Sequence, residues 1–124
     1  MSITINKGSS VTLEVTNGSP ITPLSFWVFT NPAGTNTWNP VSQTPTFVAS
    51  GATGAILIPA PPFTTGMKIG WFLTFFGTSN VLNQPYMASV DIQQGGANVL
   101  IPTWTTAGAF QGPSKSVKGS EDIA

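Results

Sequence analysis

The sequence has very few charged residues, and three of the ionisable side-chain types are missing. Charged residues make up 6% of the 124 residues, against about 25% in an ordinary globular domain. There is no arginine and no histidine. A nucleic-acid surface needs several Lys or Arg side chains clustered on one face, so we expect no nucleic-acid partner. The charged residues are Lys7, Glu14, Lys68, Asp91, Lys115, Lys118, Glu121 and Asp122.

The absence of cysteine and histidine restricts the possible chemistry. It excludes disulfides and thiolate or imidazole metal ligands. Acid–base catalysis would then require paired carboxylates, or a Ser or Thr nucleophile with a lysine base. The carboxylates are scattered, and the adjacent Glu121 and Asp122 are more typical of a solvated polar segment than of a calcium site. We therefore predict no enzymatic activity, no catalytic residue, no bound metal and no cofactor.

Two kinds of hydrophobic segment are also missing. Residues 1–16 alternate between apolar and polar and contain no signal-peptide core. No run approaches the roughly 20 apolar residues of a transmembrane helix. The expected location is cytoplasmic, or outside the cell by a non-classical route.

Apolar residues are nevertheless abundant enough to build a core. They make up 40% of the chain, and four are tryptophans. The most apolar run is Met67–Phe76, in which Ile69, Trp71, Leu73 and Phe75 fall on one face of a strand. Its other face is half apolar. This pattern predicts an inner strand covered on both faces, and Leu24–Thr30 shows the same two-sided pattern.

The remaining pattern predicts an all-β fold. Ser2–Asn6 and Val11–Thr16 alternate around a glycine turn and are expected to be adjacent antiparallel strands. No window has helical periodicity. About eight short strands separated by turns predict one antiparallel β-sandwich, Ig-like or jelly-roll-like, over residues 1–107. Residues 108–124 are polar and are expected to form a flexible C-terminal tail. The other predicted strands are Thr46–Ala49, Ala55–Ile58, Tyr86–Ile92 and Asn98–Ile101.

Trp38 is the leading candidate for a binding residue. It lies in the polar, proline-rich segment Asn31–Pro45, between Asn36 and Asn39. An aromatic ring beside amide side chains can stack on and hydrogen-bond a neutral sugar, and tryptophan is also a common interface anchor. Alternatively, Trp38 folds back over the core. Trp104 is a weaker candidate of the same kind.

Three functions are compatible with these features. The first is a structural, self-assembling subunit of a homo-oligomer, filament or coat, because a nearly uncharged surface repels its own copies weakly. In that case a chain end reaching a neighbouring subunit could order the tail. The second is a lectin-like module that binds a neutral glycan through Trp38, Asn36 and Asn39. The third is a β-rich toxin that oligomerises on membranes.

Overall fold

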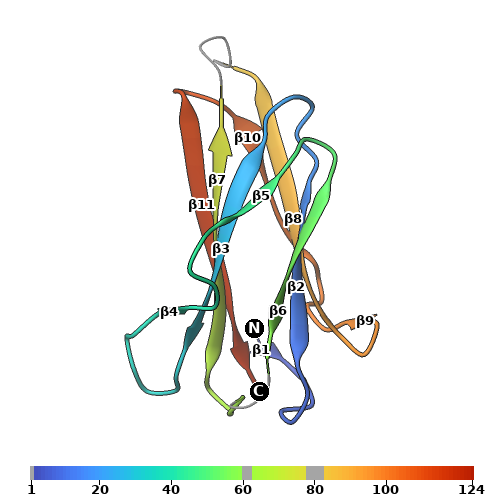
Figure 1. Ribbon diagram of the computed structural model, residues 1–124, viewed down its shortest axis with the longest axis vertical. Helices are drawn as coiled ribbons and strands as arrows, with labels where there is room; N and C mark the ends of the chain where they lie inside the picture. Colours follow the sequence, from blue (N-terminus) through green and yellow to red (C-terminus); the bar gives the residue numbers. More distant parts are fainter. Residues whose placement is uncertain (1, 60–62, 78–82) are drawn as a thin grey trace.

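The computed structural model describes residues 2–59, 63–77 and 83–124, and the secondary structure of these residues consists of strands (Figure 1). Among the described residues, four strands span eight to ten residues, whereas three are only two residues long. Their bounds are β1 Ser2–Ile3, β2 Val11–Asn17, β3 Leu24–Asn31, β4 Asn39–Pro40, β5 Thr46–Val48, β6 Thr53–Ile58, β7 Lys68–Phe76, β8 Pro85–Gln94, β9 Ala97–Asn98, β10 Trp104–Ala109 and β11 Ser114–Ile123.

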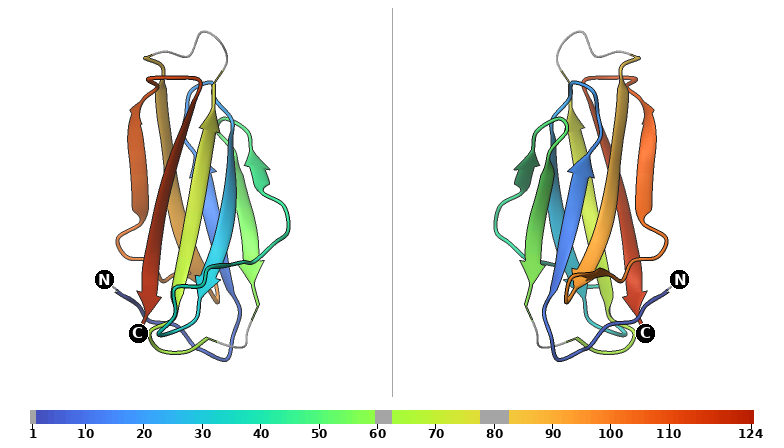
Figure 2. Two further views of the ribbon diagram at one scale, coloured as in Figure 1. Left: turned by 90° about the vertical axis from the view of Figure 1, so that its left-hand side faces the viewer. Right: turned by 90° about the vertical axis from the view of Figure 1, so that its right-hand side faces the viewer.

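The strands form two sheets that pack face to face, as the two side views show (Figure 2). Sheet A has the order β1-β11-β7-β3-β4, and β5 also pairs with β3. Sheet B has the order β10-β8-β2-β6, and β9 also pairs with β8. The prediction of an all-β fold is confirmed, and the two packed sheets are consistent with a β-sandwich.

The core lies between the sheets and is built by alternation. In β7 the side chains of Ile69, Trp71, Leu73 and Phe75 are buried, and β7 lies between β11 and β3. Every second residue of β2 is buried in the same way from the facing sheet. The prediction that Met67–Phe76 forms an inner strand is therefore confirmed.

The outer faces of β3 and β7 are open, contrary to the prediction that both faces would be covered. Phe72 and Phe76 on β7 are exposed, and Trp27 and Phe29 on β3 are partly exposed. No other layer of the described chain covers this face of sheet A. An apolar strand pattern reports a tendency to be buried, but it does not identify what provides the cover. The consequence is a row of accessible aromatic rings.

The first predicted hairpin is wrong. β1 contains only Ser2–Ile3 and pairs in parallel with the far end of β11, not with β2. The connecting loop is held instead by the side chain of Gln94. Its Nε2 donates to the carbonyls of Asn6 (2.8 Å) and Ser9 (3.0 Å), and its Oε1 accepts from the Asn6 amide (2.7 Å). Because Asn6 and Ser9 bond to this distant side chain, they do not form a local hairpin with β2.

Most of the segment predicted to be a flexible tail is a strand of sheet A. β11 pairs antiparallel with β7 from Ser114↔Phe76 to Asp122↔Lys68. Its sequence has few apolar residues because Trp71 and Trp104, from two other strands, fill the space on the inner side of β11 at Gly119. Since its own sheet orders this strand, the order of the segment no longer implies a contact with a neighbouring subunit.

The predicted strand Asn98–Ile101 is also wrong, because β9 ends at Asn98. The Asn98 side chain bonds to both main-chain groups of Leu100, donating to its carbonyl (3.0 Å) and accepting from its amide (3.1 Å). Such local side-chain bonds favour a turn over a strand. The next strand, β10, begins at Trp104.

Candidate functional site

Six aromatic side chains lie on the outer face of sheet A, where the strand pattern had predicted cover. The rings of Trp27 and Phe29 stack with centroids 6.2 Å apart, and those of Phe47 and Phe76 are 6.3 Å apart. Monomeric proteins rarely expose large contiguous apolar patches without a function. The aromatic face is the name used below for Trp27, Phe29, Trp38, Phe47, Phe72 and Phe76.

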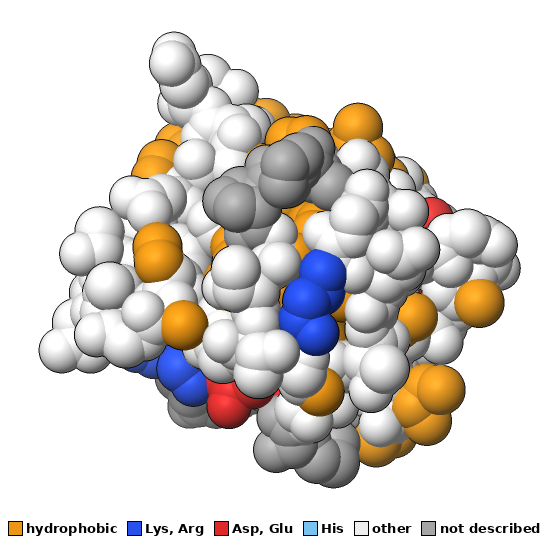
Figure 3. All heavy atoms as spheres, turned by 90° about the horizontal axis from the view of Figure 1, so that it is seen from below, with side chains coloured by type: hydrophobic (Ala, Val, Ile, Leu, Met, Phe, Trp, Pro, Cys, Tyr) orange, Lys and Arg blue, Asp and Glu red, His pale blue; other side chains and the backbone are white. Residues whose placement is uncertain are grey.

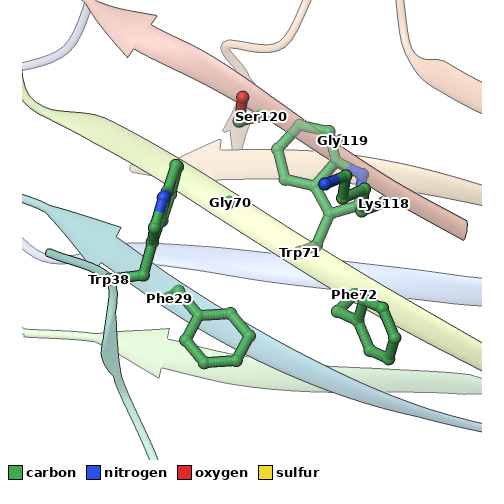
Figure 4. A pocket seen from close by; sticks show the side chains of 8 residues that line it. All are labelled: Phe29, Trp38, Gly70, Trp71, Phe72, Lys118, Gly119 and Ser120. Atoms are coloured by element: carbon green, nitrogen blue, oxygen red, sulfur yellow. The ribbon is translucent and has the colours of Figure 1, made fainter. Parts of the chain in front are cut away.

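The aromatic face contains a groove of about 430 Å³. In Figure 4, Gly70 of β7 lies at its centre, with Trp38 on one side and Ser120 of β11 on the other. The absence of a side chain at Gly70 leaves the space that the Trp38 ring occupies beside it. The complete set of lining residues is Phe29, Trp38, Gly70, Trp71, Phe72, Lys118, Gly119 and Ser120.

Trp38 is held at this groove by the chain on either side of it. On the preceding side, Gly34 adopts a positive φ of 76°, and the Thr35 amide donates to the Pro32 carbonyl at 3.2 Å. On the following side, β4 pairs Asn39 with Thr30 of β3. Trp38 is therefore the residue immediately before a strand anchored to sheet A, and its side chain remains 42% exposed.

The Trp38 ring packs directly on Gly70. A methyl group built at Gly70 would lie 2.7 Å from Trp38 Cζ3 and 3.3 Å from Cη2. The ring therefore packs on the outer face of sheet A at Gly70 and not on the core between the sheets. This position combines features of both alternatives for Trp38, since the ring is folded back onto the protein and is also accessible.

The opposite side of the groove is polar. Lys118 and Ser120 both point outward from β11, in register with Phe72 and Gly70 of β7. Beyond them, Lys68 forms an ion pair with Asp122, which removes most of the local charge effect of both groups. Lys118 has no ion-pair partner among the described residues. The groove thus offers aromatic surface on one side and an ammonium group and a hydroxyl on the other.

The other residues predicted for the site are only partly brought together. Asn36 and Asn39 are exposed next to Trp38 but do not line the groove, and within the described chain their amide side chains have no hydrogen-bond partner. Trp104 lies between the sheets, where its ring meets that of Trp71 edge to face at 5.6 Å. It is therefore separate from the groove.

Sequence reasoning missed most of the groove-lining residues. Phe29 and Phe72 were assigned to covered faces, whereas Gly70, Lys118 and Ser120 gave no separate signal. One signal could have indicated an exposed aromatic face. Leu24–Thr30 is apolar on both sides, and the chain has too few residues left to form a third layer over it.

The structure also places two carboxylates opposite each other, which their sequence positions did not suggest. Glu14 of β2 is in register with Asp91 of β8. Asp91 Oδ1 accepts hydrogen bonds from Thr103 Oγ1 (2.5 Å) and Asn98 Nδ2 (3.1 Å), while Glu14 accepts from Gln93 at 3.4 Å. Each group thus has a structural partner. Residues 2–59, 63–77 and 83–124 contain no group of three or more acidic, His or Cys side chains placed to hold a metal ion.

Comparison with family models, with curated proteins and with solved structures gave no match to this chain. In the described part of the chain, we find no helix with the length and hydrophobicity needed to span a membrane.

Proposed function

We propose that the protein is a non-enzymatic binding module whose Trp38 groove holds a neutral glycan. The observation that carries the proposal is an accessible indole facing a hydroxyl and an ammonium group across a glycine floor. The sheets would then form the Ig-like or jelly-roll-like sandwich predicted from the strand spacing, with one sheet face used for recognition.

The chemistry of the groove supports a sugar as the ligand. A pyranose ring has an apolar face of C–H groups, which packs on an aromatic ring, and a rim of hydroxyls, which need hydrogen-bond partners. Trp38 and Phe72 offer the first kind of surface, and Ser120 and Lys118 offer the second. The free amides of Asn36 and Asn39 lie nearby. A highly charged ligand is disfavoured because, in the described part of the chain, Lys118 is the only unpaired charge lining the groove.

The aromatic face favours an extended ligand over a single sugar. Phe76 lies six residues along β7 from Gly70, so the Phe47–Phe76 pair lies about 20 Å from the centre of the groove. Hydroxyls of Thr74 and Ser116 lie between them and bond to each other at 3.1 Å. An oligosaccharide lying along β7 would contact both aromatic groups.

A neutral glycan array followed by calorimetry tests the proposal. Trp38→Ala should lower the affinity at least tenfold, because it removes the central ring, and should leave the melting temperature almost unchanged, because the ring lies outside the core. Gly70→Ala should have a similar effect by displacing Trp38 while keeping every groove side chain. Phe47→Ala is the matched control: it removes an exposed ring outside the groove and should weaken only the longer oligosaccharides.

Three results would contradict the proposal. One is the absence of any neutral glycan ligand at millimolar concentration. Another is an equal loss of binding in Trp38→Ala and Phe47→Ala for a short ligand, which would indicate nonspecific aromatic contact. The third is leakage or binding of lipid vesicles that depends on Trp38, which would support the membrane-active alternative. Self-association is a separate proposal, because it would use strand edges and not this groove.

A further inference from the structure

Charge is distributed very unevenly between the two sides of the molecule. Residues 15–67 contain no charged residue, and this segment includes β3, β4, β5 and β6. In the side views, β5 and β6 lie on one side of the packed sheets and β10 and β11 on the other (Figure 2). The end view shows charged side chains only in small groups among uncharged ones (Figure 3).

On the side formed by β10 and β11, the edge of sheet A is protected by charge. β11 carries Lys115, Lys118, Glu121 and Asp122, which are four of the eight charges in the chain. Lys115 and Glu121 alternate with the outward residues and so point toward the inter-sheet side. Charged and inward-pointing side chains on edge strands prevent pairing with other chains.

The edges of sheet B have no comparable protection, since β10 and β6 are both uncharged, but of these two strands only β6 exposes a large apolar side chain. Among the described strands, β6 is a terminal strand of sheet B and pairs only with β2. Its sequence, Thr-Gly-Ala-Ile-Leu-Ile, contains neither charge nor proline. β5 touches it at Gly54, where Val48 Cγ2 lies 2.8 Å from the position of an added methyl. Beyond that contact the edge continues to Ile58, and the Leu57 side chain is 60% exposed.

We infer that β6 pairs antiparallel with β6 of a second copy of this chain. Two identical edges related by a two-fold axis are self-complementary, and strand addition provides main-chain hydrogen bonds whatever the side chains are. Sheet B would then continue across the axis in the order β10-β8-β2-β6-β6-β2-β8-β10.

Electrostatic repulsion does not oppose this arrangement at physiological salt. The charge nearest the edge is Glu14, which is opposite Ala55 on the neighbouring strand β2. Two Glu14 carboxylates would be three strand spacings apart, about 14 Å, whereas the Debye length is about 8 Å. The groove lies on the outer face of sheet A and stays accessible in the dimer.

Light scattering after size exclusion, using the full chain at several concentrations, tests this inference. The wild type should have the mass of a dimer, and Leu57→Lys should shift it to a monomer by placing a charge on the edge. Ala55→Lys is a second variant of the same edge and should also give a monomer. Its lysine lies opposite Glu14 and can form an ion pair within the subunit. Ala107→Lys, which puts the same charge on the exposed outer face of β10, should remain a dimer. Circular dichroism checks that each variant is folded.

Two outcomes would overturn the inference. A wild-type protein that stays monomeric at millimolar concentration would exclude the dimer. Dissociation by Ala107→Lys, with both β6 variants still dimeric, would assign the interface to β10. Glycan binding by the isolated Leu57→Lys subunit should match the wild type per groove, so this test does not depend on the ligand proposal.

Discussion

Gly119→Ala should destabilise the fold, although Gly119 lies in a strand whose backbone any residue can adopt. A methyl group at this position would lie 2.6 Å from Trp71 Nε1, 2.8 Å from Trp71 Cε2 and 2.9 Å from Trp104 Nε1. Carbon contacts are most favourable near 3.5–4.0 Å. Both rings would therefore have to retreat by roughly 1 Å to restore ordinary contact distances.

The cost follows from how little room the rings have. Trp71 is 1% exposed and packs against Trp104 edge to face. Forcing an extra methyl into a packed core costs about 1–3 kcal/mol. Removing a glycine from the unfolded chain recovers about 0.4–1 kcal/mol. The free energy of unfolding should therefore fall by about 1–2 kcal/mol, which corresponds to a lowering of the melting temperature by about 4–8 °C.

Urea unfolding followed by tryptophan fluorescence measures this change, and calorimetry gives the melting temperature. Gly112→Ala is the matched control, because a methyl there meets no atom within 4 Å. It should leave stability unchanged or slightly raised. If Gly119→Ala and Gly112→Ala melt at the same temperature, the packing of Trp71 and Trp104 over β11 is incorrect, and so is the explanation given for the polar sequence of that strand.

Three further substitutions test the core and the sheet surface. Trp71→Ala should lower the free energy of unfolding by about 3–5 kcal/mol through lost burial and a cavity; a loss below about 1 kcal/mol would place Trp71 outside the core. Asn17→Ala should cost about 2–4 kcal/mol in urea unfolding, because the buried amide donates to two main-chain carbonyls at 2.9 and 3.1 Å, which would lose their donor; the exposed Asn36→Ala is its control. Glu14→Gln should stabilise the fold by about 0.2–1 kcal/mol by removing a like charge opposite Asp91; destabilisation would show that the carboxylate is used.

The parts of the fold that could be predicted were those with a local signal. The Met67–Phe76 segment is identifiable because large apolar residues occupy every second position, and this pattern can be read without knowing the partner strands. The position of β11 could not be predicted, since Gly119 acquires its role only when Trp71 and Trp104 are above it. Similarly, Ser2–Ile3 pairs with residues more than a hundred positions away, so no local pattern could specify its partner.

The candidate site shows the same limit. Trp38 was recognisable because a tryptophan in a polar, proline-rich segment has no obvious core role. Gly70 was not recognisable, because its function is to leave space for that ring. Trp104 was selected by the same reasoning as Trp38 and lies between the sheets, since the sequence does not indicate toward which side a strand-end aromatic will point.

The pairing of β7 with β11 has a consequence for synthesis on the ribosome. β11 begins at Ser114, 38 residues after β7 ends at Phe76. At about 5–20 residues per second, roughly 2–8 s pass before that partner is translated. During this interval the most apolar strand of the nascent chain has one unpaired edge, which chaperones or other nascent chains can occupy. Synonymous codons that slow translation between Gly77 and Pro113 should therefore increase aggregation without altering the protein's sequence.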